Sequence, residues 1–165
     1  MKKLMFAFAL VLMLCGSAFA TVDCFNAKGS LLVADVHGLS FESDYYQNTS
    51  FTLSNITSTA VTCRVTVYDQ NGDDISSNGN VYVAGNSANL INVSTSGTFE
   101  IPANSTRIYK IQNSNTTRFS GYAVIEWTSD SEKQRKALIA GMYTFFRSRS
   151  EKFTWGSQLN NGQPF

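Results

Sequence analysis

The sequence predicts one all-β domain, folded as a single antiparallel β-sandwich. Apolar and polar residues alternate in short runs, and turn-forming residues separate the runs. The polar positions are filled mainly by Ser, Thr and Asn, since charged residues make up only 15% of the chain. These three residue types are poor in helix interiors, because their side chains compete for main-chain hydrogen bonds. We therefore expect strands.

The stretch 48–72 contains the clearest strand pattern. Phe51 and Leu53 share one parity, and polar residues lie between them. In the next run, one parity holds only apolar residues and Cys; its members are Val61, Cys63, Val65 and Val67. A period of two places one set of side chains in a core and the other in water. The stretch is therefore expected to supply two neighbouring strands of the core.

Further strands are predicted on both sides of this stretch. They cover residues 29–39, 81–84, 90–93, 97–101, 107–111 and 121–127. In the last of these, Ala123, Ile125 and Trp127 share one face. Residues 42–48 are predicted to form a polar loop that carries two tyrosines.

Residues 129–146 allow two interpretations. Ser129 and Glu132 have the spacing of a helix capping box, and a helix over residues 130–140 would follow from it. Gly141 and the β-prone run after it favour a polar loop that leads into a strand over residues 137–146. We prefer the loop and strand.

The predicted strand 137–146 is apolar on both faces, and a sandwich core covers only one of them. We expect Leu138, Met142 and Phe146 to form the face left outside the core, and soluble monomers avoid such patches. A loop-like C-terminal tail, residues 153–165, is the nearest cover. A second copy of the chain, associating through Ala137–Phe146, is the alternative.

Residues 1–20 have the features of a cleaved signal peptide. Lys2 and Lys3 precede the apolar stretch Leu4–Leu14, and Ala18-Phe19-Ala20 follows as a small-x-small cleavage site. The apolar stretch is short for a membrane-spanning helix, so a retained anchor is the less favoured alternative. We expect a sandwich domain over residues 21–152, no transmembrane segment after cleavage, and a periplasmic or secreted protein.

Cys24 and Cys63 are the two cysteines that follow the predicted cleavage site. An exported chain with two thiols is expected to form one disulfide, here between Cys24 and Cys63. Two buried free thiols are the alternative. A metal site is less favoured, because the chain has one histidine, His37.

The charge balance argues against nucleic-acid binding. Removing Lys2 and Lys3 with the signal peptide leaves 11 basic residues (13 − 2) and 12 acidic ones, a net charge of −1. Six of the remaining basic residues bracket the apolar run 137–146. They are Lys133, Arg135, Lys136, Arg147, Arg149 and Lys152. A solvated surface is the simplest interpretation, and an anionic partner such as a polysaccharide or a membrane surface is the sharper one.

No catalytic residue, cofactor or resident metal is predicted. A serine hydrolase needs a base beside its nucleophile, and His37 is the only histidine and lies outside any recognisable motif. Oxygen ligands in the loop Asp69, Asn71, Asp73 and Asp74 resemble a calcium loop, but a closing Glu is missing, so a hairpin turn is favoured. Tyr45, Tyr46 and Trp155 are the candidates for contact with a sugar ring.

The stretches LSNITSTAVTCRVTVYDQNG and GTFEIPANSTRIYKI give the chain a resemblance to secreted bacterial immunoglobulin-like or fibronectin-III-like modules, over residues 48–127. The resemblance implies a β-sandwich. Our leading hypothesis is an exported, non-catalytic binding or structural module with a protein or polysaccharide partner at the bacterial cell envelope. The alternative is a carbohydrate-binding protein or a glycan-active enzyme that uses exposed Tyr and Trp residues.

Overall fold

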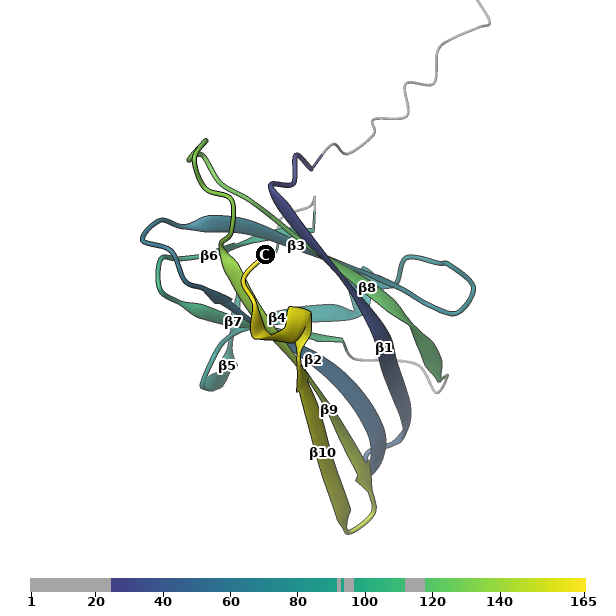
Figure 1. Ribbon diagram of the computed structural model, residues 1–165. Coiled ribbons are helices and arrows are strands. Elements are labelled where there is room, and N and C mark those ends of the chain that lie inside the picture. Colours follow the sequence, from purple (N-terminus) through teal and green to yellow (C-terminus); the bar gives the residue numbers. More distant parts are fainter. Residues whose placement is uncertain (1–24, 92, 94–96, 112–117) are drawn as a thin grey trace, which may run out of the picture.

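Ten antiparallel strands form most of the regular structure in the computed structural model, which describes residues 25–91, 93, 97–111 and 118–165 (Figure 1). The strands are β1 (Gly29–Glu42), β2 (Tyr45–Asn55), β3 (Val61–Tyr68), β4 (Gly79–Val83), β5 (Asn86–Ile91), β6 (Thr98–Ile101), β7 (Thr106–Ile111), β8 (Phe119–Thr128), β9 (Leu138–Ser148) and β10 (Glu151–Gln158). Two short 3-10 turns, η1 (Ser76–Asn78) and η2 (Leu159–Gly162), complete the described regular structure. The predicted signal peptide and Cys24 lie outside the described residues.

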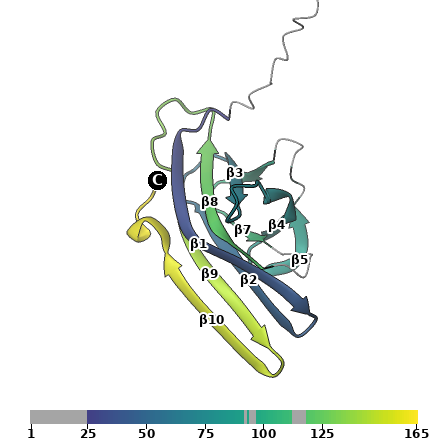
Figure 2. The ribbon, with the colours of Figure 1, turned by 90° about the vertical axis from the view of Figure 1, so that its right-hand side faces the viewer.

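The strands are joined into one sheet that curls round a core and is nearly closed (Figures 1 and 2). Along its main path the order is β5-β4-β7-β2-β1-β8-β3-β6, and the β9–β10 hairpin pairs with β2. Strand β1 links the two halves, because its first part pairs with β8 and its last residues pair with β2. A register shift between Val33 and Val36, with Asp35 at a φ of 59°, lies in the part paired with β8.

The core contains the side chains that the alternation predicted for the centre of the chain. All four inward residues of β3 are at most 3% exposed, and Phe51 and Leu53 of β2 are fully buried. Ala123, Ile125 and Trp127 of β8 are fully buried beside them. The all-β, antiparallel architecture is therefore confirmed. The division into two sheets of an immunoglobulin-like sandwich stays a proposal.

The interpretation of residues 129–146 as a loop and a strand is confirmed, but the faces of the strand were assigned the wrong way round. Leu138, Ala140 and Thr144 are at most 2% exposed and point into the core, and Met142 packs partly buried against it. The opposite face, with Tyr143 and Phe145, is partly exposed. Periodicity could not separate the two faces, since both carry apolar residues.

The expectation of a loop-like tail is wrong. Residues 151–158 form β10, which pairs with β9 from Glu151↔Ser148 to Gln158↔Gly141. Every β10 residue is exposed, so the strand lacks the half-buried pattern that reveals a strand in a sequence. Its main chain is ordered by hydrogen bonds to the free edge of β9.

The end of the tail closes one end of the core. Leu159 and Phe165 pack against the buried residues. The main-chain oxygen of Phe165 accepts hydrogen bonds from the indole Nε1 of Trp127 (2.8 Å) and from the main-chain nitrogens of Ala137 (2.9 Å) and Leu138 (3.2 Å). The tail therefore completes the domain as well as extending from it.

The polar loop expected over residues 42–48 is also wrong. Strand β2 begins at Tyr45, so only a two-residue turn separates β1 from β2. This change moves Tyr45 and Tyr46 from a loop onto a strand that pairs with β9.

Candidate functional site

The outward face of β2 forms the floor of a groove. Gln47, Thr49 and Phe51 share the inward parity, so Tyr46, Asn48 and Ser50 point the other way. Strand β9 lies on one side of β2 and β7 on the other, with β4 beyond β7. Four strands that are distant in the sequence therefore contribute to one surface.

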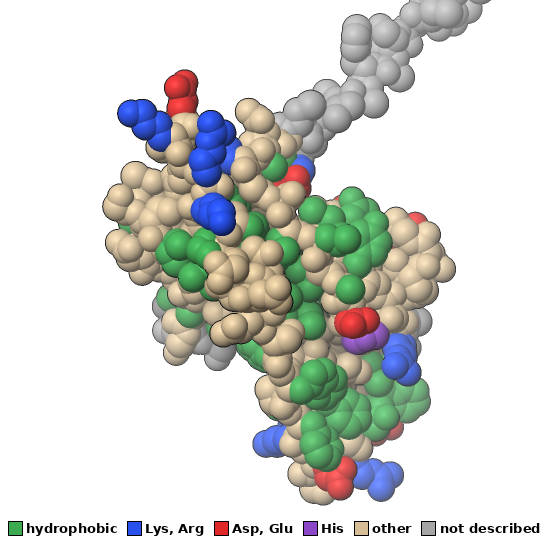
Figure 3. All heavy atoms as spheres, viewed as in Figure 1, with side chains coloured by type: hydrophobic (Ala, Val, Ile, Leu, Met, Phe, Trp, Pro, Cys, Tyr) green, Lys and Arg blue, Asp and Glu red, His purple; other side chains and the backbone are tan. Residues whose placement is uncertain are grey.

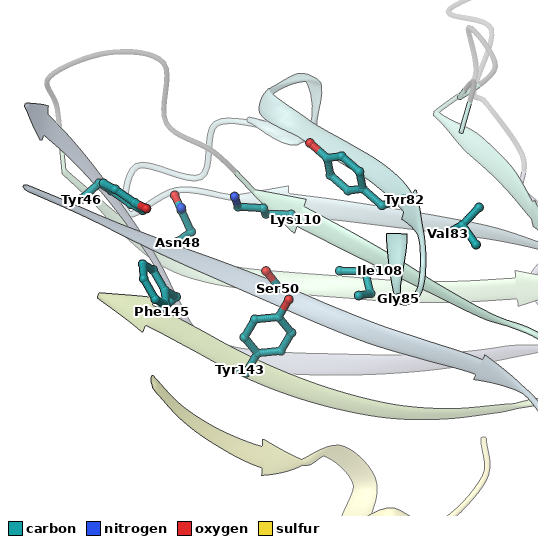
Figure 4. A pocket seen from close by; sticks show the side chains of 10 residues that line it. All are labelled: Tyr46, Asn48, Ser50, Tyr82, Val83, Gly85, Ile108, Lys110, Tyr143 and Phe145. Atoms are coloured by element: carbon teal, nitrogen blue, oxygen red, sulfur yellow. The ribbon is translucent and has the colours of Figure 1, made fainter. Parts of the chain in front are cut away.

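The groove has a volume of about 830 Å³, and Figure 4 shows its side chains. Its lining residues are Tyr46, Asn48, Ser50, Tyr82, Val83, Gly85, Ile108, Lys110, Tyr143 and Phe145. Four of these carry aromatic rings, three carry amide, hydroxyl or ammonium groups, and the rest are apolar or Gly. A cavity of this size and mixture is typical of a small-molecule or oligomer binding site.

Polar groups at the bottom of the groove are shielded by larger neighbours. Asn48 is 8% exposed and Ser50 is 2% exposed, although both point away from the core. In the register of the sheet, Asn48 lies opposite Phe145, and Ser50 lies between Tyr143 and Lys110. Longer side chains therefore wall in a floor of short hydrogen-bonding groups.

Tyr46 and Phe145 form an aromatic wall of the groove. Their ring centroids are 5.7 Å apart, and the planes are tilted by 35°. Both residues are partly exposed. Each therefore keeps apolar ring surface available to a ligand.

Of the described residues that line the groove, Lys110 is the only charged one. It is partly buried, and desolvation by that burial lowers the pKa of its ammonium group from the usual value of lysine. The pairing of β7 with β2 and β4 positions the main chain of Lys110.

A second aromatic cluster lies at the far end of the β9–β10 hairpin. Tyr45 packs edge-on against Phe146 (5.6 Å between centroids) and Phe41 (6.4 Å), and Phe146 stacks on Phe153 (6.4 Å). Figure 3 shows hydrophobic side chains gathered at this end of the molecule. Trp155, which is 51% exposed, shares the face of Phe153 on β10.

The three predicted sugar-binding residues are thus not brought together. Tyr46 lines the groove, while Tyr45, its neighbour on β2, points to the opposite face and joins the second cluster. Trp155 lies outside the groove lining.

The predicted basic patch is divided between the two ends of β9. Lys133, Arg135 and Lys136 precede the strand and are exposed. Arg147 lies next to the end of β9, Arg149 lies in the hairpin turn, and Lys152 is the second residue of β10. An 11-residue strand separates the two groups by roughly 30 Å, so the six residues do not form one surface.

The carboxylates of the predicted calcium loop have partners within the turn itself. Asp69 Oδ1 accepts hydrogen bonds from the main-chain nitrogens of Asn71 (2.8 Å) and Asp73 (3.0 Å), and Asp74 Oδ1 accepts from the nitrogen and hydroxyl of Ser76. The turn, with Gly72 at a φ of 86°, is closed as a short antiparallel hairpin by the bridge between Tyr68 and Asp74, although β3 and β4 do not pair with each other. Among the described residues, no group of three or more His, Cys, Asp or Glu side chains is placed to hold a metal.

Cys63 is fully buried, and desolvation raises the pKa of its thiol above the usual range. Cys24 lies outside the described residues, so the Cys24–Cys63 disulfide stays a prediction. Phe25, the next residue, lies over the guanidinium group of Arg64, 4.6 Å from Cζ to the ring centroid. The chain next to Cys24 therefore approaches the strand that carries Cys63.

His37 lies on β1, where its main-chain nitrogen and oxygen both bond the hydroxyl of Thr49. It is not among the residues that line the groove.

The sequence indicated Tyr46 as a candidate but not the rest of the groove. Tyr82, Lys110, Tyr143 and the floor residues lie on separate strands, and only the strand order brings them together. If β2 had been predicted to begin at Tyr45, its alternation would have placed Tyr46, Asn48 and Ser50 together on the outward face. The prediction of a loop over residues 42–48 excluded this.

Comparison with protein-family models, curated proteins and solved structures found no match for this chain. Within the described residues, no helix has the length and hydropathy needed to span a membrane.

Proposed function

We propose that the protein is an exported, non-catalytic binding module of the cell envelope or extracellular space, with an immunoglobulin-like β-sandwich, and that it binds a saccharide chain in the groove on β2. The observation that carries the proposal is the shielded polar floor of Asn48 and Ser50 between aromatic side chains. The signal-peptide features of residues 1–20 support export.

This arrangement suits the chemistry of a sugar. A pyranose ring presents hydroxyl groups at its edge and C–H groups on its faces. Amide and hydroxyl groups in the floor can exchange hydrogen bonds with the hydroxyls, and the rings of Tyr46, Tyr143 and Phe145 offer flat apolar surface to the C–H faces. The groove extends across β9, β2, β7 and β4, which suits a chain more than a single enclosed ring.

The groove chemistry favours binding over hydrolysis. Glycoside hydrolysis ordinarily uses two carboxyl groups on either side of the scissile bond. The groove lining contains no Asp or Glu within the part of the chain that the structure describes.

A glycan array followed by calorimetric titration tests the proposal. We expect purified protein to bind at least one saccharide saturably, and Tyr143→Ala to weaken that binding about tenfold, or 1.4 kcal/mol. Tyr122→Ala is the matched control, because Tyr122 is an exposed tyrosine on β8 and lies outside the groove. Absence of saccharide binding, or equal loss in both variants, would overturn the proposal.

A further inference from the structure

We infer that the saccharide bound in the groove is acidic, and that the ammonium group of Lys110 binds its carboxylate. This inference rests on the proposed function and names the class of sugar. Lys110 lies directly across from Ser50 on β2 and from Asn80 on β4, at the centre of the strands that form the groove. Asn48 is the diagonal neighbour of Lys110 on β2 (Figure 4).

The described part of the chain does not provide a carboxylate for this ammonium group. Among the residues that the structure describes, no Asp or Glu lines the groove, and none forms an ion pair or hydrogen bond with Lys110 Nζ. The segments 86–89, 92, 94–96 and 112–117, which follow β4, β5 and β7 in the sequence, contain only Asn, Ser, Ala, Gln and Thr. Within the described residues, the ammonium group is therefore left available to a carboxylate of a bound ligand.

Partial burial of the ammonium group strengthens its interaction with a carboxylate. A partly desolvated ammonium group has lost part of its hydration, and a carboxylate at hydrogen-bond distance restores favourable electrostatics. The alternative is that Lys110 only packs against its neighbours, and the polar groups around its ammonium group are less consistent with that role. The groove places the ammonium beside hydroxyl and amide groups that can bind the same sugar, and Figure 4 shows the amine directed along the groove toward Asn48 and Tyr46.

A uronic acid matches this set of groups. Its ring carries hydroxyls for Asn48 and Ser50, a C–H face for an aromatic side chain, and one carboxylate for Lys110. Its methyl ester has the same ring and the same hydroxyls but no charge, so the pair isolates the contribution of Lys110.

The experiment is calorimetric titration with oligogalacturonate, oligoglucuronate and the methyl ester of each. For at least one of the acids, we expect the wild-type protein to bind the acid at least tenfold more tightly than its ester. The preference should shrink as salt is raised. Lys110→Met should abolish the preference, and Lys110→Arg should retain most of it. Lys136→Met is the control, because Lys136 is an exposed lysine before β9 and outside the groove.

The outcomes separate the two claims. If esters bind as tightly as acids, or if Lys110→Met keeps the preference while its thermal unfolding matches that of the wild type, the acidic class is wrong and the groove still binds saccharide. If wild-type protein binds neutral saccharides on the array but neither uronate, the acidic class is wrong as well. If no saccharide of either kind binds, the proposed function fails together with the inference.

Discussion

At the scale of single residues, Gly121 shows how closely the strands approach one another. A Cβ atom built at this position would lie 1.8 Å from the main-chain oxygen of Tyr68. The oxygen belongs to the main chain of a paired strand, so it cannot move aside as a flexible side chain could. Gly121 pairs with Val36, at the register shift in β1, so β8 is held here on both sides.

We therefore predict that Gly121→Ala destabilises the fold by about 1–3 kcal/mol, the usual cost of overpacking. Thermal or urea unfolding measures the effect. Gly141→Ala is the matched control in β9, because its added Cβ would meet nothing closer than 3.7 Å. Equal stability of the two variants would show that β3 and β8 do not approach as closely as described.

Asn55 is a residue whose role the sequence concealed. The sequence predicts only a turn after β2, but Asn55 is 2% exposed and its side chain connects three segments. Its Nδ2 bonds the main-chain oxygens of Thr59 (2.8 Å), Ile101 (3.0 Å) and Pro102 (3.0 Å). In the sequence, Asn55 cannot be distinguished from an ordinary turn residue, because its partners Ile101 and Pro102 are 46 and 47 residues away.

At the scale of elements, the β9–β10 hairpin shows which strands can be predicted from their own residues and which depend on contacts with other segments. The strand β9 was predictable from its β-prone residues. The strand β10 was not, because its order comes from the edge of β9 rather than from a buried face. The residues after it are ordered by contacts with Trp127 and Leu138, which precede them by many residues.

We predict that deleting residues 159–165 lowers the free energy of unfolding by at least about 2 kcal/mol. The deletion removes Leu159 and Phe165 from the core and leaves the buried indole N–H of Trp127 without its acceptor. Phe153→Ala is the control within the same tail; Phe153 is 52% exposed, so we expect a loss under about 1 kcal/mol.

Sedimentation of both variants shows whether the tail also limits association. The exposed edge of β10 is a surface on which two copies can pair, and this is where self-association would now be sought. A full-length monomer whose truncation leaves stability and association unchanged would contradict the closure role of Phe165.

At the scale of the whole molecule, the sequence predicts the strands and most of their inward faces, because alternation is a local property. It does not predict the groove. Tyr46, Tyr82, Lys110 and Tyr143 become neighbours only through the order β4-β7-β2-β9, which depends on pairing between distant segments. The same limit explains why the faces of β9 were reversed: two apolar faces can be distinguished only by what packs against them.

The pH dependence of global stability reports on the core side of the same strand, β7. Tyr109 is 4% exposed, stacks on Phe51 (6.0 Å between centroids) and donates a hydrogen bond to the main-chain oxygen of Ser76 (3.1 Å). Desolvation, and then the charge of Asp74, raise the pKa of its hydroxyl above the usual range. In the unfolded chain that group ionises near its ordinary pKa of about 10.

We predict an alkaline loss of stability from Tyr109. A raised folded pKa gives a contribution that is complete below the unfolded pKa and decreases as pH rises toward the folded pKa. Above about pH 10 the unfolded state binds fewer protons than the folded state, so the free energy of unfolding falls by up to about 1.4 kcal/mol per pH unit. Urea unfolding between pH 8 and pH 11 measures the slope.

Tyr109→Phe should reduce that slope, at the cost of about 1 kcal/mol at neutral pH for the lost hydrogen bond. Tyr122→Phe is the control, since Tyr122 is 40% exposed, and it should leave the slope unchanged. Cys63 adds to the alkaline loss only as a free thiol, and then from a lower pH, near the ordinary cysteine pKa of about 8.5. A slope that is the same in wild type and Tyr109→Phe would mean that the hydroxyl is not held neutral in the core. A loss that begins near pH 9 in Tyr109→Phe would instead point to Cys63 as an unpaired thiol, against the predicted bond to Cys24.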